Sequence, residues 1–424
     1  MARANDTIAS ALTWLDYSEH DRRRALDVID LFRETGTVDE LGLASVRDSF
    51  SDLFFPGTST IQTRACYFLL VPWTFLRLER LGTSSSKAEA RARREELRLN
   101  SRMLARGDKR GVFGSQAGMT LKRLPSEVYW GGLGNWGIRT FSGHMWAYFR
   151  SLDGFYRRGD QFRNTPHDPE GRSAPPANWH PHLPAPPSGF PNDNVSVVLR
   201  RQDAEYLRDR IQARHPESLL AVLASRADPA DLDANHPWQL SPLSEVSSVL
   251  REQLHDAEMF AVCMQGAALL YNLMLSELQE HERRRETYRG ELDAWAGDLE
   301  ALGSKLPDWQ LDGVWRVVRE QGRSVGYPTR TFVESWIAGL KQGGSEAVVR
   351  DNSGAKALVR NREIQLKRGR ARLVSQRHLE LWGGRSGTGR LNYRWGDSPM
   401  AGTRMILRDI FDGLERSEGD AGDT

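Results

Sequence analysis

Residues 164–193 constrain the fold most, because they hold nine of the chain's 19 prolines. Proline has no backbone N–H donor and a fixed φ angle, so a regular helix or an inner sheet strand cannot run through so dense a series. We therefore expect an extended connector or a long surface loop here. It separates an N-terminal helical domain, residues 1–163, from the remainder of the chain.

The remainder is predicted to contain a second helical domain, residues 194–345, a basic region, residues 346–414, and a disordered acidic tail, residues 415–424. Apolar residues recur at the helical spacing of three and four through most of both domains. Strand-like alternation of apolar and polar residues is confined to residues 194–201 and 371–376. We expect a mainly α fold of two packed helical blocks with few short strands.

Composition is typical of a globular protein of the cytoplasm. The 424 residues include two cysteines, Cys66 and Cys263, each within an apolar run, which argues against a disulfide framework and against a zinc site made of cysteines. The N-terminus has no apolar stretch of signal-peptide length. The longest apolar segment, residues 257–275, is interrupted by Glu258 and two amide side chains, so we expect a buried helix and no membrane span.

Turn-forming residues interrupt the first helical block. A helix is predicted over residues 39–55, and Pro56-Gly57 ends it. Thr58 or Ser59 is expected to cap the helix that follows, because hydroxyl side chains accept hydrogen bonds from the first free N–H groups of a helix.

Two further stretches of this block are predicted to be helical. Within residues 124–138, Ser126 is the expected N-cap and Gly137 the expected stop. Residues 87–102 are heavily charged and amphipathic, and we interpret them as a mostly solvated helix face.

Positive charge gathers near the C-terminal end. From Arg350 to Arg394 the chain carries twelve Lys or Arg against three acids, although its formal charge as a whole is only +2. Glycine-rich turns and the aromatics Trp382, Tyr393 and Trp395 are interleaved, which suits a surface that follows phosphates and approaches bases. A solvated basic face is the alternative. The cations expected to contact nucleic acid are Arg360, Arg362, Lys367, Arg372, Arg390 and Arg394.

Sequence signatures of several other chemistries are missing. No GxxxxGK[ST], HExxH or GxSxG occurs, which argues against a P-loop ATPase, a zinc protease of that type and an esterase with a nucleophile elbow. His180 and His182 lie close together in the proline-rich segment, but no third metal ligand is near them in the sequence. We expect neither a metal nor a cofactor.

A pair of carboxylates is the better indication of chemistry. Asp48 and Asp52 are four residues apart on a predicted helix, so they share one face. Beside a pocket floored by Phe54 and Phe55, such a carboxylate can stabilise a sugar oxocarbenium ion or activate a water molecule against it. The structural alternative is a set of salt bridges with Arg47, Arg64 or Arg77.

A cluster of polar side chains follows this helix directly. Its members are Thr58, Ser59, Thr60, Gln62 and Arg64. An ordinary helix cap needs one hydrogen-bond acceptor, so capping explains one hydroxyl and leaves four polar groups without a role. We interpret the cluster as part of a functional site.

Four stretches carry a resemblance: "LTWLDYSEHDRRRALDVIDLFRE", "DELGLASVRDSFSDLFFPGTSTIQTRACYFLLVPW", "LPSEVYWGGLGNWGI" and "LNYRWGDSPMAGTRMILRDIFDGL". They resemble a bacterial family of phage-defence islands, formerly of unknown function. That family is associated with antiviral DNA glycosylases, which remove glucosylated hydroxymethylcytosine and leave abasic sites. The resemblance spans nearly the whole chain except the proline-rich segment. It implies a cytoplasmic enzyme acting on double-stranded phage DNA with modified bases, with other defence-island proteins as further partners.

The resemblance also implies roles for the polar cluster. A glycosylase must flip its target base out of the stack. Gln62 would fill the gap left in the duplex, Thr58, Ser59 and Thr60 would bind a phosphate, and Arg64 would clamp it. The implied walls of the base pocket are Tyr129, Trp130 and Trp136, for which core packing is the alternative.

The catalytic residue is expected to be Asp48 or Asp52, in a monofunctional glycosylase. A lysine nucleophile is less favoured, because the only lysines near the motifs are Lys122 and, remotely, Lys356 and Lys367. Helical DNA glycosylases usually carry an LPGVG-type hairpin, of which this chain shares only the Leu-Pro and the glycines. The subclass stays open. Two other hypotheses are a catalytically inert DNA-binding subunit that recruits a nuclease or helicase, and a metal-dependent nuclease.

Overall fold

The computed structural model describes residues 40–107, 109–164, 177–241, 246–349, 353–384, 390–396, 398, 400 and 402–417. Within these residues the protein is mainly α-helical, as predicted, and it has no strand. The one β-type pairing among them is an isolated bridge between Arg139 and Trp179. The first resemblance motif, in residues 12–34, and the acidic residues 418–424 lie outside the described part.

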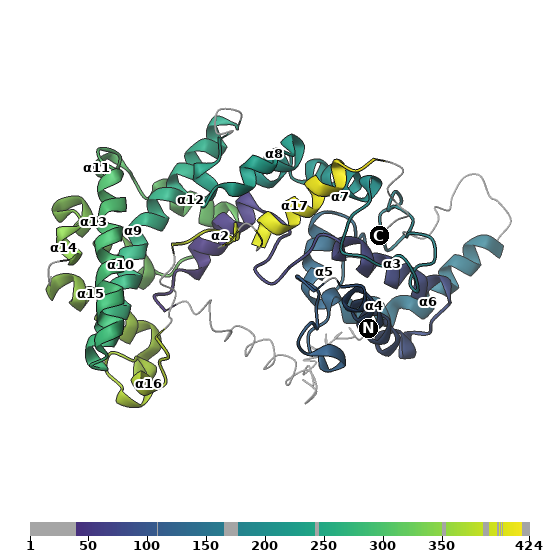
Figure 1. The fold of residues 1–424 in the computed structure, drawn as a ribbon, viewed down its shortest axis with the longest axis horizontal. Helices are drawn as coiled ribbons and strands as arrows, with labels where there is room; N and C mark the ends of the chain where they lie inside the picture. The colour runs from purple at the N-terminus through teal and green to yellow at the C-terminus, as the bar shows by residue number, and fades with distance from the viewer. Residues whose placement is uncertain are drawn as a thin grey trace, which may run out of the picture. The chain divides into compact units, whose positions relative to one another are not determined.

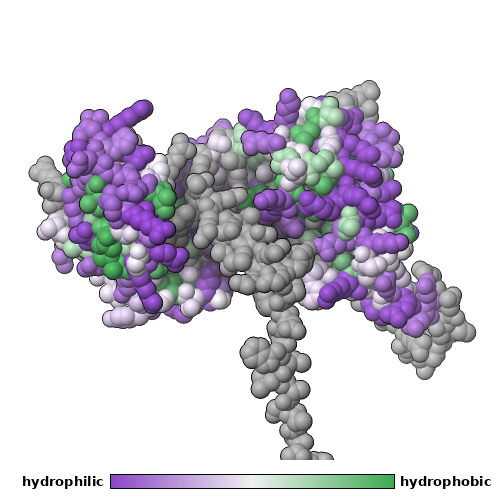
Figure 2. Space-filling model, turned by 90° about the horizontal axis from the view of Figure 1, so that it is seen from below, coloured by the Kyte–Doolittle hydropathy of each residue, from purple (hydrophilic) through white to green (hydrophobic). Residues whose placement is uncertain are grey.

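The chain divides into two compact units, each built from three separate stretches (Figure 1). The smaller unit comprises Met1–Leu43, Met264–Ala301 and Thr331–Gly389. The larger unit comprises Ala44–Cys263, Leu302–Arg330 and Arg390–Thr424. On the face that Figure 2 shows, hydrophilic side chains prevail and smaller hydrophobic patches lie between them.

The larger unit is a helical assembly in which the last helix packs among much earlier ones. Its helices are α2 (Ala44–Phe54), α3 (Tyr67–Arg80), α4 (Ser85–Ala105), η1 (Gly118–Thr120), α5 (Pro125–Asn135), α6 (Met145–Asn164), α7 (Arg201–Arg214), α8 (Leu219–Arg226), η2 (Pro229–Asp233), η3 (Pro237–Gln239), α11 (Lys305–Asp308), α12 (Asp312–Glu320) and α17 (Gly402–Leu414). Helix α17 packs against α7, α8 and η2, α3 packs against α4 and α5, α6 packs against α4, and α12 packs against α2. These packings bury the apolar faces that the sequence pattern predicts.

The smaller unit contains α10 (Glu282–Ala301), α14 (Glu346–Val349), α15 (Ser353–Lys367), η5 (Arg368–Arg370) and α16 (Gln376–Glu380). Two helices, α9 (Ser248–Leu278) and α13 (Tyr327–Gly343), have residues in both units. Helix α9 is long and apolar enough to cross a membrane, but 89% of its most apolar window is buried inside the protein. Such burial is typical of a helix that packs in a protein core.

Neither of the predicted short strands forms. In residues 194–201 the side chains of Val195, Val197 and Leu199 are buried in alternation, which produced the strand-like pattern. This segment packs on helix α17, where a Cβ on Gly413 would lie 3.0 Å from Cβ of Leu199, and no second strand among the described residues pairs with it. Alternating burial alone is therefore not enough for a sheet, which needs a neighbouring backbone.

The second expected strand, residues 371–376, is absent for a different reason. The backbone N–H groups of Arg372 and Leu373 donate to the carboxylate of Glu363, at 2.9 Å each. A buried side chain thus takes the donors that a neighbouring strand would have taken.

Two predicted helix caps were wrong. Thr58 Oγ1 donates to the carbonyl of Phe55 at 2.7 Å, so it closes the end of α2, and α3 begins only at Tyr67 without a side-chain cap. Ser126 lies inside the first turn of α5, which begins at Pro125 because proline suits the first helical position.

The predicted end of α5 is confirmed. Gly137 follows its C-terminal residues with a φ of 65°, the left-handed conformation that glycine tolerates best.

Candidate functional site

The polar turn, which we define as residues 56–66 between α2 and α3, holds the predicted polar cluster in the larger unit. Gln62 is only 2% exposed. Its Oε1 accepts from the backbone N–H of Ser59 at 3.0 Å, and its Nε2 donates to the carbonyl of Gly57 at 3.2 Å. The amide therefore ties the turn together and does not face solvent. Of the five predicted polar residues, Thr60 is the one with an exposed side chain.

Two aromatic side chains, one from α5 and one from the residue directly after it, support the polar turn. The hydroxyl of Tyr129 accepts from the N–H groups of Thr63 (2.9 Å) and Arg64 (3.1 Å) and donates to the carbonyl of Arg64 (2.8 Å). Trp136 Nε1 donates to the carbonyl of Pro56 at 2.8 Å. Burial raises the pKa of Tyr129. Both aromatic rings, like that of Trp130, are buried in the core, so core packing accounts for their presence.

An ion pair fixes the other end of the polar turn to helix α17. Arg64 and Asp409 form a two-pronged pair, with Nε to Oδ2 at 2.9 Å and Nη2 to Oδ1 at 2.8 Å. Asp409 also accepts from the N–H of Ala65 at 2.8 Å. Burial raises the pKa of Asp409, and the hydrogen bonds from Arg64 oppose that effect. The guanidinium predicted to clamp a phosphate is thus engaged with a buried carboxylate.

Asp52 lies beside the polar turn and is partly accessible. Its carboxylate pairs with Arg323 and with Arg394, and 31% of its side chain is exposed. Arg394 also donates to the carbonyl of Thr58 at 3.0 Å, so one guanidinium joins the carboxylate to the turn. The structure therefore brings together a predicted catalytic residue, a predicted phosphate-binding residue and a cation of the C-terminal motif.

Asp48 has a simpler environment on the same helix. Its Oδ1 lies 2.9 Å from Nε of Arg47, one of the partners that the sequence suggested. The suggested Arg77 instead lies 3.7 Å from Glu95. Among the described residues Asp48 has no hydrogen bond or ion pair with the polar turn, so Asp52 is the stronger candidate of the two.

The predicted pocket floor is part of an aromatic core. Phe54 and Phe55 are fully buried, as are Tyr393 and Trp395 from the C-terminal motif. Phe55 stacks on Trp395 with ring centroids 5.5 Å apart, and Phe54 meets Tyr393 edge-on at 6.0 Å. These contacts attach residues 390–396 to α2. Tyr393 and Trp395, two of the aromatic residues interleaved in the basic region, therefore contribute to the core of the larger unit.

Sequence reasoning missed a buried polar cluster between α4 and α5. Glu96 of α4 is 3% exposed, and its Oε2 accepts from the backbone N–H of Ser126 at 2.8 Å. A glutamate of one helix thus satisfies a free N–H group at the start of another. Burial raises the pKa of Glu96 to about 7. The other carboxylate oxygen, Ser126 Oγ and Asn100 Nδ2 are buried without a hydrogen-bond partner among the described residues.

A signal for this cluster was present in the sequence. Ala88, Ala92, Glu96 and Met103 recur at helical spacing, and all four are buried. The apolar members mark the inward face of α4, so a glutamate on that face must be buried. The predominance of charge in residues 87–102 concealed this face.

The basic region has two different environments. Arg394 lies in the larger unit, as does the partly buried Arg390. In the smaller unit Lys367 pairs with Glu40 and with Glu363, the latter at 3.3 Å, and Arg372 Nη1 lies 2.6 Å from Glu40 Oε1. Several cations predicted to contact DNA are therefore neutralised inside the protein.

The other two predicted cations of the smaller unit also have internal partners. Arg362 is 4% exposed, and its Nε donates to the carbonyl of Leu41 at 2.8 Å. Arg360 is exposed, and its Nη2 donates to the carbonyl of Leu373 at 3.1 Å. Arg362 is thus a structural residue of the smaller unit in this conformation.

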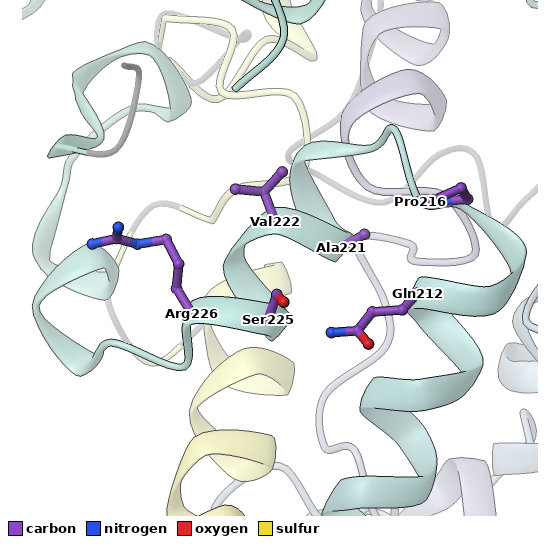
Figure 3. A pocket seen from close by; sticks show the side chains of 6 residues that line it. All are labelled: Gln212, Pro216, Ala221, Val222, Ser225 and Arg226. Carbon is purple, nitrogen blue, oxygen red and sulfur yellow. The ribbon is translucent and has the colours of Figure 1, made fainter. Parts of the chain in front are cut away.

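A surface pocket of about 310 Å³ lies between α7 and α8 in the larger unit (Figure 3). Its lining consists of Gln212, Pro216, Ala221, Val222, Ser225 and Arg226. It contains none of the predicted site residues, and no carboxylate, histidine or cysteine. The pocket therefore offers no acid or base for catalysis at neutral pH.

Metal-binding groups do not gather in the described ranges: no cluster there of three or more His, Cys, Asp or Glu residues could hold a metal ion. His180, from the histidine pair considered as ligands, has its Nε2 2.9 Å from Nη1 of Arg210. A cation at that distance competes with a metal for the ring nitrogen.

The fold and the site define a mainly α-helical protein with an arginine-bound carboxylate beside a polar turn that tertiary hydrogen bonds hold in place. A family model matches residues 9–404 and is described as a family of unknown function, DUF6361. The chain belongs to this family. No curated protein and no solved structure matches it.

Gly132→Ala is expected to destabilise the larger unit, because a Cβ there would lie 2.4 Å from the carbonyl oxygen of Gly57 and 2.9 Å from Nε2 of Gln62. Overpacking of this kind costs about 1–3 kcal/mol in the free energy of unfolding. Urea denaturation measures it. The matched control is Gly131→Ala, where an added Cβ meets nothing within 4 Å and helix propensity favours alanine. Equal destabilisation by both variants would contradict the close approach of α5 to the polar turn.

Glu96→Gln is expected to change how stability depends on pH. The folded pKa of about 7 exceeds the ordinary 4.5, so the folded state keeps a proton that the unfolded state loses. The contribution of Glu96 to the free energy of unfolding is then fully present below pH 4.5 and is lost as the pH rises through 7. Gln keeps a hydrogen-bond acceptor and cannot ionise. The variant should lack about 2–3 kcal/mol of the decrease in unfolding free energy between roughly pH 5 and pH 8.

Chemical denaturation at both pH values measures this difference. Glu89→Gln, at an exposed position of the same helix, is the control and should retain the wild-type pH dependence. The same decrease in wild type and Glu96→Gln would show that Glu96 does not titrate in this range.

Proposed function

We propose that this protein is an antiphage DNA glycosylase that flips a hypermodified cytosine, such as a glucosylated hydroxymethylcytosine, out of double-stranded phage DNA and excises it. It would act in the cytoplasm, leave an abasic site and need neither metal nor cofactor. The observation that carries the proposal is the partly exposed carboxylate of Asp52, held by two arginines beside the polar turn. The resemblance of the sequence motifs supplies the substrate class.

The chemistry suits a carboxylate. Excision breaks the bond between C1′ of the deoxyribose and the base nitrogen, and positive charge develops on the sugar. Asp52 would stabilise that charge and orient or deprotonate the water molecule that adds its oxygen to C1′. The departing base takes up the proton. The ion pairs with Arg323 and Arg394 fix the direction of the carboxylate.

The neighbouring turn would make the contact with the DNA backbone. Thr60 is its exposed hydroxyl, and Arg394 joins the turn to Asp52. Because Gln62 is enclosed within the turn, filling the gap in the duplex would require the turn to open or another side chain to take that role.

A non-catalytic DNA-binding subunit that recruits a nuclease or helicase is the second candidate. Asp52 already pairs with two arginines, so its carboxylate oxygens are engaged and less available to a developing sugar cation. The predicted pocket residues Phe54, Phe55 and Tyr129 are buried in the core. Both features suit a protein that binds DNA without changing it.

Asp52→Asn is expected to lower base excision at least about 10²-fold, because the amide cannot carry the negative charge. The assay incubates the protein, with EDTA present, with DNA carrying glucosylated hydroxymethylcytosine and with unmodified DNA. Mild alkali then converts abasic sites to strand breaks. Asp48→Asn is the control on the same helix and should retain activity. Thermal unfolding of both variants monitors loss of the Asp52 ion pairs.

Alkali-dependent breaks confined to modified DNA, lost in Asp52→Asn with DNA binding retained, are the expected result. Intact DNA with wild-type protein, in samples where binding is detected, would overturn the glycosylase and favour the recruiting subunit. Breaks that disappear only when EDTA is present would instead indicate a metal-dependent nuclease.

A further inference from the structure

We infer that Arg368, Arg370 and Arg377 form a phosphate-binding surface for double-stranded DNA on the smaller unit. We call these three residues the arginine face. The inference rests on the DNA binding that the proposed function requires, and it replaces most of the cations that the sequence suggested. It concerns backbone contacts and is independent of which residue breaks the glycosidic bond.

The starting point is how the cations of this region are distributed. Residues 353–384 contain eight Lys or Arg and two Glu. Five of the eight cations are engaged inside the smaller unit. These are Lys356 with Glu277, Arg360 with the carbonyl of Leu373, Arg362 with that of Leu41, and Lys367 and Arg372 with Glu40. Their charges or donors stabilise the unit.

The other three cations are different. Arg368, Arg370 and Arg377 are exposed. None of the three has a side-chain hydrogen bond or an ion pair within the described ranges. The second acid of the region, Glu380, accepts from Nε2 of Gln376 at 3.2 Å. The arginine face therefore presents three donor groups whose charge no carboxylate of the described part of the chain pairs with, and this is the electrostatic requirement for following a phosphate backbone.

The backbone that carries the arginine face is held by a buried carboxylate. Glu363 is fully buried and accepts from the N–H groups of Arg372 and Leu373, directly after η5. Tyr271 donates to the same carboxylate at 2.5 Å. This network fixes the backbone between η5 and α16, the two elements that carry the three arginines. Ordered cations lose less conformational entropy when they bind phosphates.

Local conformation supports a binding role for Arg368. Its φ is 52°, in the left-handed region that non-glycine residues adopt uncommonly. Glycine would relieve that strain, and Gly369 stands next to it, yet this position carries a long cationic side chain. Exposed apolar side chains lie in the same segment, with Val374 55% and Leu381 77% exposed. They suit contact with deoxyribose carbons between phosphates.

The test replaces all three residues, as Arg368→Gln, Arg370→Gln and Arg377→Gln in one chain. Fluorescence anisotropy measures the Kd for a labelled duplex of about 30 base pairs, a length comparable to typical bound sites, across a series of salt concentrations. Each lost phosphate contact lowers the slope of log K against log salt by about 0.9. We expect a slope smaller by about 2–3 and at least about 10-fold weaker binding near physiological salt.

The charge-matched control changes Arg201, Arg208 and Arg285 to Gln. These arginines each pair with a carboxylate, of Glu205, Asp209 and Glu282. The control removes the same formal charge and should leave the slope within about one unit of wild type. Circular dichroism of both variants verifies folding. A wild-type slope in the arginine-face variant, or an equal loss in the control, would overturn the inference.

The outcome separates this inference from the glycosylase proposal. Wild-type protein that binds DNA with the predicted slope change but excises no base would leave the arginine face standing and overturn the glycosylase. If the arginine-face variant binds DNA as wild type does and wild type excises the base, the arginine face is overturned and the glycosylase proposal stands.

Discussion

The buried ion pair between Arg64 and Asp409 is the contact on which the larger unit's candidate site depends. It joins residues 345 positions apart in the chain, and Asp409 also holds the backbone N–H of Ala65. A buried carboxylate with this set of donors keeps the polar turn attached to α17, and removal of either partner would leave an uncompensated charge in the core. The turn is therefore positioned by tertiary contacts at both ends, with Tyr129 and Trp136 on one side and Asp409 on the other.

A second buried carboxylate organises the smaller unit in a similar way. Glu363 accepts from two backbone N–H groups and from Tyr271, and Lys367 approaches it at 3.3 Å. In each unit a buried carboxylate therefore fixes an irregular segment: the polar turn in the larger unit, and the residues between η5 and α16 in the smaller one. Exposed groups lie in these segments or directly beside them: Thr60 in the polar turn of the larger unit, and Arg368 and Arg370 of η5 in the smaller unit.

The sequence predicted classes of structure better than roles of residues. Helical periodicity indicated the mainly α fold, and Gly137 marked the end of α5, because these features depend on neighbouring residues alone. Thr58 and Ser126 are residue types that often cap helix N-termini. However, Thr58 closes the end of the preceding helix, and Ser126 lies inside the first turn of α5, after Pro125. Residues 194–201 alternate like a strand because one side packs on α17. An alternation of apolar and polar residues therefore indicates which side chains are buried, but it does not identify the element against which they pack.

The sequence by itself determined that the chain folds into helices, that α2 ends before Pro56-Gly57 and that positive charge gathers near the C-terminal end. Only the tertiary structure decided which charges are free. It paired Lys367 and Arg372 with Glu40, Arg64 with Asp409, and Asp52 with Arg323 and Arg394, and it left the arginine face unpaired within the described ranges. The physical reason is that helix formation depends on a few neighbouring residues, whereas the state of a charge depends on groups far away in the chain.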